Sequence, residues 1–420
     1  MGLAAVLTIC FSAGASADNL ANALPKGVME TPRPDYDAQG IALDNWTLFP
    51  SLAATANYDD NVFRSLANRN WDWYFETTPA FRLQRKTQDG VFDIFGDADF
   101  FNYVEFPRLN LTDWTIGADS KLNLSTHFAA ALSGYYGEYH EDFASVNLIE
   151  NPSAEREYTR YFKGHFETAA SYGSGDWLVS GGASLDRFDW QSTVLLSGLH
   201  VSNEDRNATY VDPYARVAYQ VAPSYQVYAR ALYDRRDFDE LRDRFGFDRD
   251  SSGVELDGGM TALIGQTLNL DAFLGYREQQ FRNFAVDPDH RLQDVAELDY
   301  GLTADWYAAP TFTAHLSATR SLSDLILPDA SLSDDQTVRL SADWEARHDV
   351  IVQEFVAYTY SRLIGTERVD RYPAAGVTLR YLINRYASAE LAYLFTARHS
   401  TDRPSEFSDQ IVTVGLNLHI

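Results

Sequence analysis

The chain has 420 residues, with 34 Lys and Arg against 60 Asp and Glu, which gives a net charge of −26 at pH 7. This acidity argues against nucleic acid as a partner, because affinity for phosphates comes from cationic side chains. Aromatic residues make up 14% of the chain, too much for a disordered acidic protein. Beyond the first twenty residues, no apolar run approaches the length of a membrane-spanning helix. The single cysteine, Cys10, excludes an intrachain disulfide and a cysteine-ligated zinc site.

The N-terminus has the pattern of a signal peptide. A short apolar run covers residues 3–11, and Ala15 and Ala17 then provide the small residues that signal peptidase requires. We therefore expect residues 1–17 to be a signal peptide, with a lipid anchor on Cys10 or a buried helix as the alternatives.

The next segment, residues 18–45, does not read as a strand. It lacks a two-residue alternation of polar and apolar side chains, and it contains Pro25, Pro32 and Pro34. Proline cannot donate a hydrogen bond to a sheet ladder. The sequence therefore predicts an arm that lies outside any sheet, and strands that begin at Trp46.

From Trp46 to Ile420 the dominant pattern is strict alternation. Between residues 91 and 106, for example, Asp93 and Asp97 alternate with Phe92 and Ile94. A strand places these acids on one face and the apolar residues on the other, whereas a helix would mix them on one stripe. The same alternation recurs at residues 254–264, 296–306 and 412–420.

The connections between these alternating segments are of two lengths. Short polar turns fall at residues 87–90, 125–126, 173–176, 222–224, 265–267, 309–310, 348–349 and 384–385. Longer connections fall at residues 59–70, 107–111, 142–157, 191–207, 238–251, 283–292, 324–334, 365–367 and 401–406. Short periplasmic turns that alternate with long outer loops are typical of outer-membrane barrels.

We therefore predict an all-β fold, a transmembrane antiparallel up-and-down barrel of about 18 strands over residues 46–420. Both chain ends then face the periplasm, so residues 18–45 form a periplasmic arm that docks to an export partner or tucks into the lumen. A soluble β-sandwich is the alternative. The long strands, the charged face and the aromatic residues near strand ends, which suit a bilayer girdle, all argue against it. These aromatics are Trp71, Trp73, Tyr74, Tyr103, Phe106, Tyr135, Tyr136, Tyr139, Trp306, Tyr307, Tyr358 and Tyr360.

Two motifs resemble a known family. The first, R-P-x-Y-D-x-x-G, contains Arg33, Pro34, Tyr36, Asp37 and Gly40. The second, Y-D-D-N-V-F, contains Tyr58, Asp59, Asp60, Asn61 and Phe63. In this order, ahead of a strand ladder, they resemble the "putative β-barrel porin type 2" family of Gram-negative outer membranes. The resemblance implies a role in exopolysaccharide or capsule export, or as a porin, and it carries over no catalytic residue.

The inward face of the predicted barrel is the main candidate site. An excess of lumen carboxylates would favour cations, although a polar lumen without selectivity is the plainer interpretation. The predicted lumen-lining residues are Asp93, Asp97, Asp99, Asp119, Glu167, Asp212, Arg216, Arg230, Glu255, Asp257, Asp271, Arg277, Glu297, Asp299, Asp305, Asp343, Glu345, Arg380 and Glu390. Five inward aromatics are candidates for contact with sugar rings, or else fill the wall: Tyr161, Tyr210, Tyr214, Tyr228 and Phe273.

Three further features have a functional and a plainer interpretation. The oxygens of Asp59, Asp60 and Asn61 could bind Ca²⁺, but a turn in which these side chains bond their own backbone is favoured, and no metal site is predicted. The charged segment 238–251 could constrict the lumen, but a solvated outer loop is favoured. His165 shares its face with acids, yet no hydrolase motif is present, so we do not expect an enzyme.

Taken together, the sequence favours an outer-membrane pore for export of an exopolysaccharide or capsule-type polymer through an acidic lumen. A general or cation-preferring diffusion porin is the alternative, ahead of an adhesin, a structural barrel or a hydrolase. The expected partners are outer-membrane lipid, lipopolysaccharide, the polysaccharide chain and a periplasmic polysaccharide-export protein. No cofactor and no nucleic acid are expected.

Overall fold

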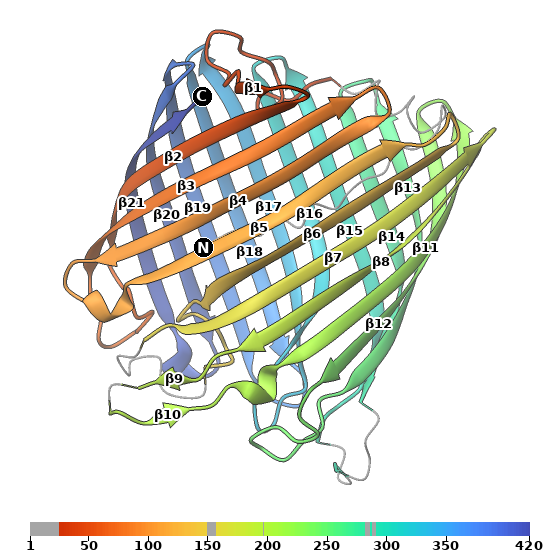
Figure 1. Cartoon of the computed structure of the whole chain (residues 1–420). Helices are drawn as coiled ribbons and strands as arrows, with labels where there is room; N and C mark the ends of the chain where they lie inside the picture. The colour runs from red at the N-terminus through yellow and green to blue at the C-terminus, as the bar shows by residue number, and fades with distance from the viewer. Residues whose placement is uncertain (1–24, 149–156, 196, 282–285, 288–290) are drawn as a thin grey trace.

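The protein is a closed antiparallel barrel (Figure 1). A computed structural model describes residues 25–148, 157–195, 197–281, 286–287 and 291–420, and the predicted signal peptide lies outside these ranges. Within them, eighteen strands form the wall, each hydrogen-bonded to its neighbours, and the last strand pairs with the first. No helix in the described part of the chain is long and apolar enough to cross a membrane.

The wall strands are β2 (Trp46–Asp59), β3 (Asp72–Thr87), β4 (Gly90–Tyr103), β5 (Leu111–Asn123), β6 (Phe128–Glu141), β7 (Thr159–Ser174), β8 (Trp177–Trp190), β11 (Ala208–Ala222), β12 (Tyr225–Phe238), β13 (Ser251–Ile264), β14 (Leu268–Phe281), β15 (Val295–Ala309), β16 (Phe312–Asp324), β17 (Leu332–Arg347), β18 (Val350–Leu363), β19 (Val369–Asn384), β20 (Ala387–Ser400) and β21 (Phe407–His419). Outside the wall lie β1 (Ile41–Leu43), β9 (Thr193–Val194), β10 (His200–Val201) and the single 3₁₀ turns η1 (Pro107–Leu109), η2 (Glu204–Arg206) and η3 (Arg403–Ser405).

The strand count and the order of turns and loops confirm the sequence prediction. All eight short turns and all nine long connections lie between the predicted strands. Figure 1 shows the turns, β1 and the C-terminus at one end of the barrel and the long loops at the other. The alternation is also as expected, because large apolar side chains point outward. Leu256, Leu274 and Leu298 on adjacent strands each expose more than half of their surface, 56%, 58% and 55%, as a lipid-facing band requires.

The predicted aromatic girdle is only partly right. Trp71, Trp73 and Trp306 are exposed on the outside of the barrel. In contrast, the Tyr103 hydroxyl lies 3.0 Å from that of Tyr158, and Phe106 packs against the buried Phe63. Neighbouring residues on a strand face opposite sides, so a run of aromatics supplies both a girdle and a set of inward rings. The inward rings pack against the loops.

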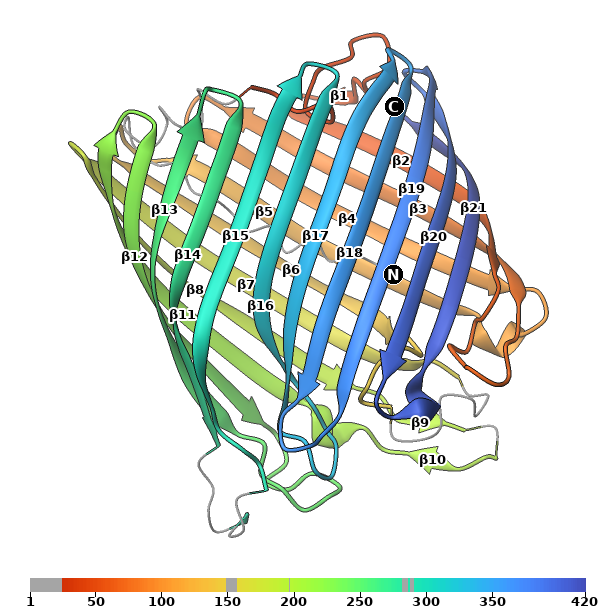
Figure 2. The same ribbon diagram turned by 180° about the vertical axis from the view of Figure 1, so that it is seen from behind.

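One junction in the wall departs from a complete ladder. β15 and β16 pair only as far as Gly301 and Thr319, and they diverge toward the loop end of the barrel (Figure 2). Side chains bridge the strands there instead. Nη1 of Arg320 donates to the Leu298 carbonyl at 2.5 Å, and Nη1 of Arg277 donates to the Arg320 carbonyl at 3.3 Å. The Arg320 guanidinium also pairs with Asp334 on β17.

The arm folds into the turn end of the barrel over its described residues. Val28 is fully buried, and its backbone N–H donates to Oγ1 of Thr313 on β16 at 3.0 Å. Arg33 is 4% exposed, and its Nη2 donates to the Val28 carbonyl and to Glu345 on β17, both at 2.8 Å. The carboxylate of Asp37 stabilises the turn at residues 33–37 by accepting a hydrogen bond from the Arg33 N–H. The expectation that the whole of residues 18–45 lies outside any sheet is wrong at one point, because Ile41–Leu43 form β1 and pair with β2.

Candidate functional site

Four inward carboxylates of β4 and β5 lack cationic partners, whereas a fifth, that of Asp113, lies 2.6 Å from Nδ1 of His140. Asp93 on β4 lies directly opposite Asp119 on β5, an arrangement of like charges that destabilises a sheet. Their hydrogen-bond donors are neutral, because Nε2 of Gln84 donates to Asp93 at 2.9 Å and Oγ of Ser133 donates to Asp119 at 2.6 Å. Asp99 accepts from the hydroxyl of Thr78. We call Asp93, Asp97, Asp99 and Asp119 the β4–β5 acids. Among the described residues, none of the four forms an ion pair.

Three inward carboxylates of β13 and β15 are ion-paired. Glu255 lies opposite Arg277, with 2.7 Å between Oε1 and Nε, and Nη2 of the same guanidinium is 3.2 Å from Asp299. Asp257 lies opposite Arg230, with 2.6 Å between Oδ2 and Nη2. We call Glu255, Asp257 and Asp299 the β13–β15 acids. They and the two arginines nearly cancel in charge, whereas the charge of the β4–β5 acids is left uncompensated by an ion pair.

The other predicted lumen residues also lie on inward faces and take individual partners. Asp271 accepts from Tyr228 and Thr261, Asp212 accepts from Ser184, and Glu167 lies 3.9 Å from His165. Glu297 pairs with Arg320 and Arg362, Asp305 and Asp343 pair with His315, Glu345 pairs with Arg33, and Glu390 pairs with Arg380.

Some of the aromatics predicted to contact sugar pack against glycines of neighbouring strands in the wall. The ring of Tyr228 occupies the space where a Cβ of Gly259 would lie, and the guanidinium of Arg216 sits 3.9 Å from the ring centroid. Phe273 lies in the same way against Gly301, with Arg230 4.7 Å from its centroid.

The same layering of glycine, ring and guanidinium recurs at Gly376, Phe355 and Arg339. Tyr214 similarly lies close against Gly182. Period-two alternation predicts that these rings face inward, but it does not show which ring packs on a glycine of the next strand or lies under an arginine.

The remaining two aromatics lie near the loop end. Tyr161 stacks on Trp190 with centroids 4.4 Å apart, and Tyr210 lies 5.2 Å from Phe188. A cavity of about 340 Å³ opens here between the wall and the loops. Its lining includes Phe188, Trp190, Tyr210 and Phe238, together with the polar groups of Asn147, Arg206, Arg236 and Asp324.

The loop after β6 crosses the mouth of the barrel. Nη1 of Arg398 on β20 donates to the Ala144 carbonyl at 2.8 Å. Nδ2 of Asn147 donates to the Asp324 carbonyl at the end of β16, and Oδ1 of Asn147 accepts the N–H of Ile326 at 2.9 Å. Because β16 and β20 lie far around the barrel from β6, this loop narrows the opening.

The segment between β12 and β13 differs from the solvated outer loop that its sequence favours. Phe247 is fully buried in an apolar cluster with Phe281 and Leu332. Arg249 is 2% exposed and donates to the carbonyls of Leu325, Leu327 and Ala330. The segment therefore folds inward, because its two phenylalanines and the Arg249 donors find partners only inside the mouth. Its alternation of Asp and Arg masked this in the sequence.

Loop carboxylates near the mouth are held ionised by arginine. Burial alone would raise the pKa of Asp205, but hydrogen bonds from the Arg244 side chain and backbone lower it below the usual range. Burial likewise tends to raise the pKa of Asp142, but the charge of Arg64 and the hydrogen bond from the Ala144 N–H together lower it. The loops are therefore pinned to one another by charge at neutral pH.

The Tyr58 to Asn61 segment forms the favoured turn. Oδ1 of Asp59 accepts the N–H of Asn61 at 2.7 Å, and Oδ1 of Asn61 accepts the N–H of Ser65 at 3.0 Å. Asn61 is fully buried and its amide also donates to the Ser408 carbonyl on β21. The motif thus fixes the first outer loop to the last strand.

His165 is part of the wall packing. Its Nδ1 lies 3.0 Å from Oδ1 of Asp186, and its ring stacks on Tyr135 with centroids 5.0 Å apart. Lys163 shares the same carboxylate at 3.0 Å. These contacts account for the histidine through packing and charge balance.

The closed wall, the outward apolar band and the polar, loop-narrowed lumen define an outer-membrane porin. The chain belongs to the family described as "Putative beta-barrel porin 2", whose sequence model matches residues 33–420. The family confirms the resemblance carried by the two N-terminal motifs, and the protein resides in the outer membrane of a Gram-negative bacterium.

Several solved structures have a distantly similar fold. OpdK of Pseudomonas aeruginosa, solved with vanillate, is 9% identical, with a TM-score of 0.46 over 89% of this chain and 99% of that chain. OccAB3 of Acinetobacter baumannii is 9% identical, with a TM-score of 0.46 over 90% of this chain and 100% of that chain. P. aeruginosa OpdL is 11% identical, with a TM-score of 0.43 over 90% and 100%. No curated protein sequence matches the chain.

Proposed function

We propose that this porin is a passive channel for small hydrophilic solutes, with a preference for cations. The observation that carries the proposal is the set of β4–β5 acids, which face the lumen without an ion-pair partner in the described chain, and three of which accept hydrogen bonds from neutral donors. Unpaired fixed charge of one sign concentrates counter-ions in a pore.

The restriction to small solutes rests on the two ends of the barrel. At the loop end, the Ala144–Asn147 stretch bridges the mouth to β16 and β20. At the turn end, the arm is anchored to β16 and β17 through Val28 and Arg33. Obstructions at both ends oppose the passage of a continuous polymer more than that of a small hydrated solute. The proposal assigns no catalytic role.

The test is a reversal-potential measurement in a planar bilayer across a KCl gradient. We expect the sign of cation preference, and we expect the preference to grow as the salt concentration falls, because screening weakens. An anion-selective reversal potential at low salt would contradict the proposal.

Export of an exopolysaccharide is the second proposal, with a periplasmic export protein as its partner. The aromatic cavity beside Trp190 and Tyr210 favours it, since sugar rings pack on aromatic faces while their hydroxyls bond neighbouring polar groups. Export requires that the loop after β6 leave the mouth. A deletion strain that loses surface polysaccharide while small-nutrient uptake stays normal would support export over diffusion.

A further inference from the structure

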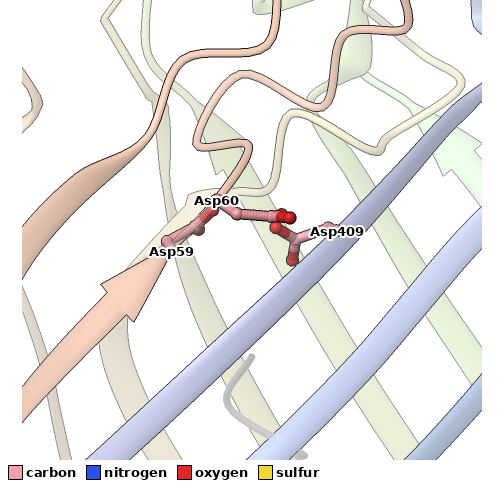
Figure 3. A group of neighbouring side chains, drawn as sticks. All are labelled: Asp59, Asp60 and Asp409. Atoms are coloured by element: carbon pink, nitrogen blue, oxygen red, sulfur yellow. The ribbon is translucent and has the colours of Figure 1, made fainter.

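Three carboxylates converge where the barrel closes on itself. Asp59 is the last residue of β2, Asp60 follows it in the loop, and Asp409 comes from β21, the strand that pairs with β2 (Figure 3). One oxygen from each lies within 4.8 Å of the others. Asp59 and Asp409 are 3% and 1% exposed, so the group is largely removed from solvent.

The cations around this group are too few. Nη1 of Arg64 lies 3.1 Å from Asp59 and 2.9 Å from Asp409, and its Nε is 3.7 Å from Asp142. Arg69 pairs with Asp60 at 2.5 Å. Two guanidinium groups therefore face four carboxylates, and two negative charges remain. Uncompensated buried carboxylates are costly, so a further cation is expected.

The unsatisfied carboxylate of Asp409 indicates where this further cation would bind. Neither of its oxygens accepts a hydrogen bond, and Oδ1 has no ion-pair partner in the part of the chain that the structure describes. Its carboxylate turns toward that of Asp60 (Figure 3). Asp60, by contrast, already accepts the backbone N–H and side-chain amide of Gln410 at 2.9 and 3.1 Å. The unpartnered oxygen lies on a different strand from the turn, so the turn itself does not explain it.

We propose that Asp59, Asp60 and Asp409 bind one Ca²⁺ ion. Clustered carboxylate oxygens are the ligands of a hard divalent cation, and Ca²⁺ tolerates irregular geometry completed by water. Its two charges equal the imbalance. The ion links the first wall strand to the last and fixes the loop that carries the buried Val62 and Phe63. It leaves the Asx turn intact, because that turn uses Oδ1 of Asp59 and the backbone.

The test is a calcium titration of the full-length barrel, purified free of lipopolysaccharide in detergent. Calorimetry with CaCl₂ should give one saturable site, with a Kd of about 10⁻⁴ to 10⁻³ M, the range of extracellular Ca²⁺ modules. Saturating Ca²⁺ should also raise the temperature at which the unboiled barrel band is lost. Asp409→Asn should weaken binding at least tenfold. Asp89→Asn, the same change in an exposed turn at the other end, should leave binding unaltered.

Two results would overturn the proposal. One is the absence of saturable Ca²⁺ binding to the wild-type barrel. The other is unchanged affinity in a folded Asp60→Asn variant, which serves as the second test if Asp409→Asn does not insert, because Asp60 is the more exposed ligand with 20% of its side chain accessible. A barrel that Asp409→Asn stabilises in EDTA, without wild-type Ca²⁺ binding, would mean that these acids share protons instead.

Discussion

The β4–β5 acids and the β13–β15 acids have similar sequence patterns but different surroundings. Around Asp93 and Asp119 the cross-strand neighbour is another acid, whereas around Glu255 and Asp257 it is an arginine. A paired acid belongs to the wall, and an unpaired acid acts on whatever enters the lumen. Counting inward carboxylates therefore overestimates the charge that a solute meets, and the pairing partner on the next strand decides each case.

The largest expected effect is a loss of barrel stability when the ion pairs of the β13–β15 acids are broken. Arg277→Met removes the guanidinium that serves both Glu255 and Asp299, and Asp299 has no exposed side-chain surface. Leaving such charges unpaired costs about 3–5 kcal/mol. Unfolding of the detergent-purified barrel in urea measures the loss. Arg339→Met is the matched control, because Arg339 lies over Phe355 without an ion-pair partner among the described residues. Equal losses in both variants would remove the distinction.

The next effect concerns the arm. Arg33→Ala leaves Glu345 without its partner and should cost about 1–3 kcal/mol locally, enough to release the arm from the turn end. Single-channel conductance should rise, while the urea midpoint of the barrel should change little because the strand ladder is intact. A deletion of residues 26–40 should give the same conductance. Unchanged conductance in both variants would show that the arm does not obstruct the pore.

A smaller effect should follow from neutralising the unpaired group. The triple substitution Asp97→Asn, Asp99→Asn and Asp119→Asn should lower the cation-to-anion permeability ratio about twofold or more at low salt, since fewer fixed charges attract cations. Stability should be equal or higher, because like charges opposite one another are removed. Asp257→Asn serves as the contrast and should alter stability more than selectivity. The reverse pattern would contradict the assignment of the two groups.

The smallest effect is on the pH dependence of the mouth. The pKa values of Asp142 and Asp205 are lowered in the folded protein, so their contribution is complete above the ordinary value of about 3.9 and is lost as pH falls below it. Loop protection from a protease should therefore be constant from pH 7 to pH 5 and should decline only below about pH 4. In Asp205→Asn, protection should already be weaker at pH 7. A decline centred near pH 6 would implicate histidines instead.

The sequence was sufficient for the barrel and for the two faces of its alternating strands, although aromatics such as Tyr103 and Phe106, expected in the girdle, pack against the loops. Alternation with a period of two places Asp97 inward and Leu298 outward, and turn lengths order the strands. It could not reveal partners that depend on register, such as Arg277 opposite Glu255, because register joins residues that are distant in the chain. It also could not place Arg249 inside the mouth or Arg33 on Glu345, since nothing local distinguishes a buried arginine from a solvated one.

The position of the arm has a consequence for the order of events in assembly. Its contacts, Thr313 on β16 and Glu345 on β17, lie 285 and 312 residues later in the chain than the arm residues that bind them. The segment that leaves the ribosome before the barrel strands therefore cannot settle until they are in place. The arm is therefore made early and reaches its final position late, after β16 and β17 have formed.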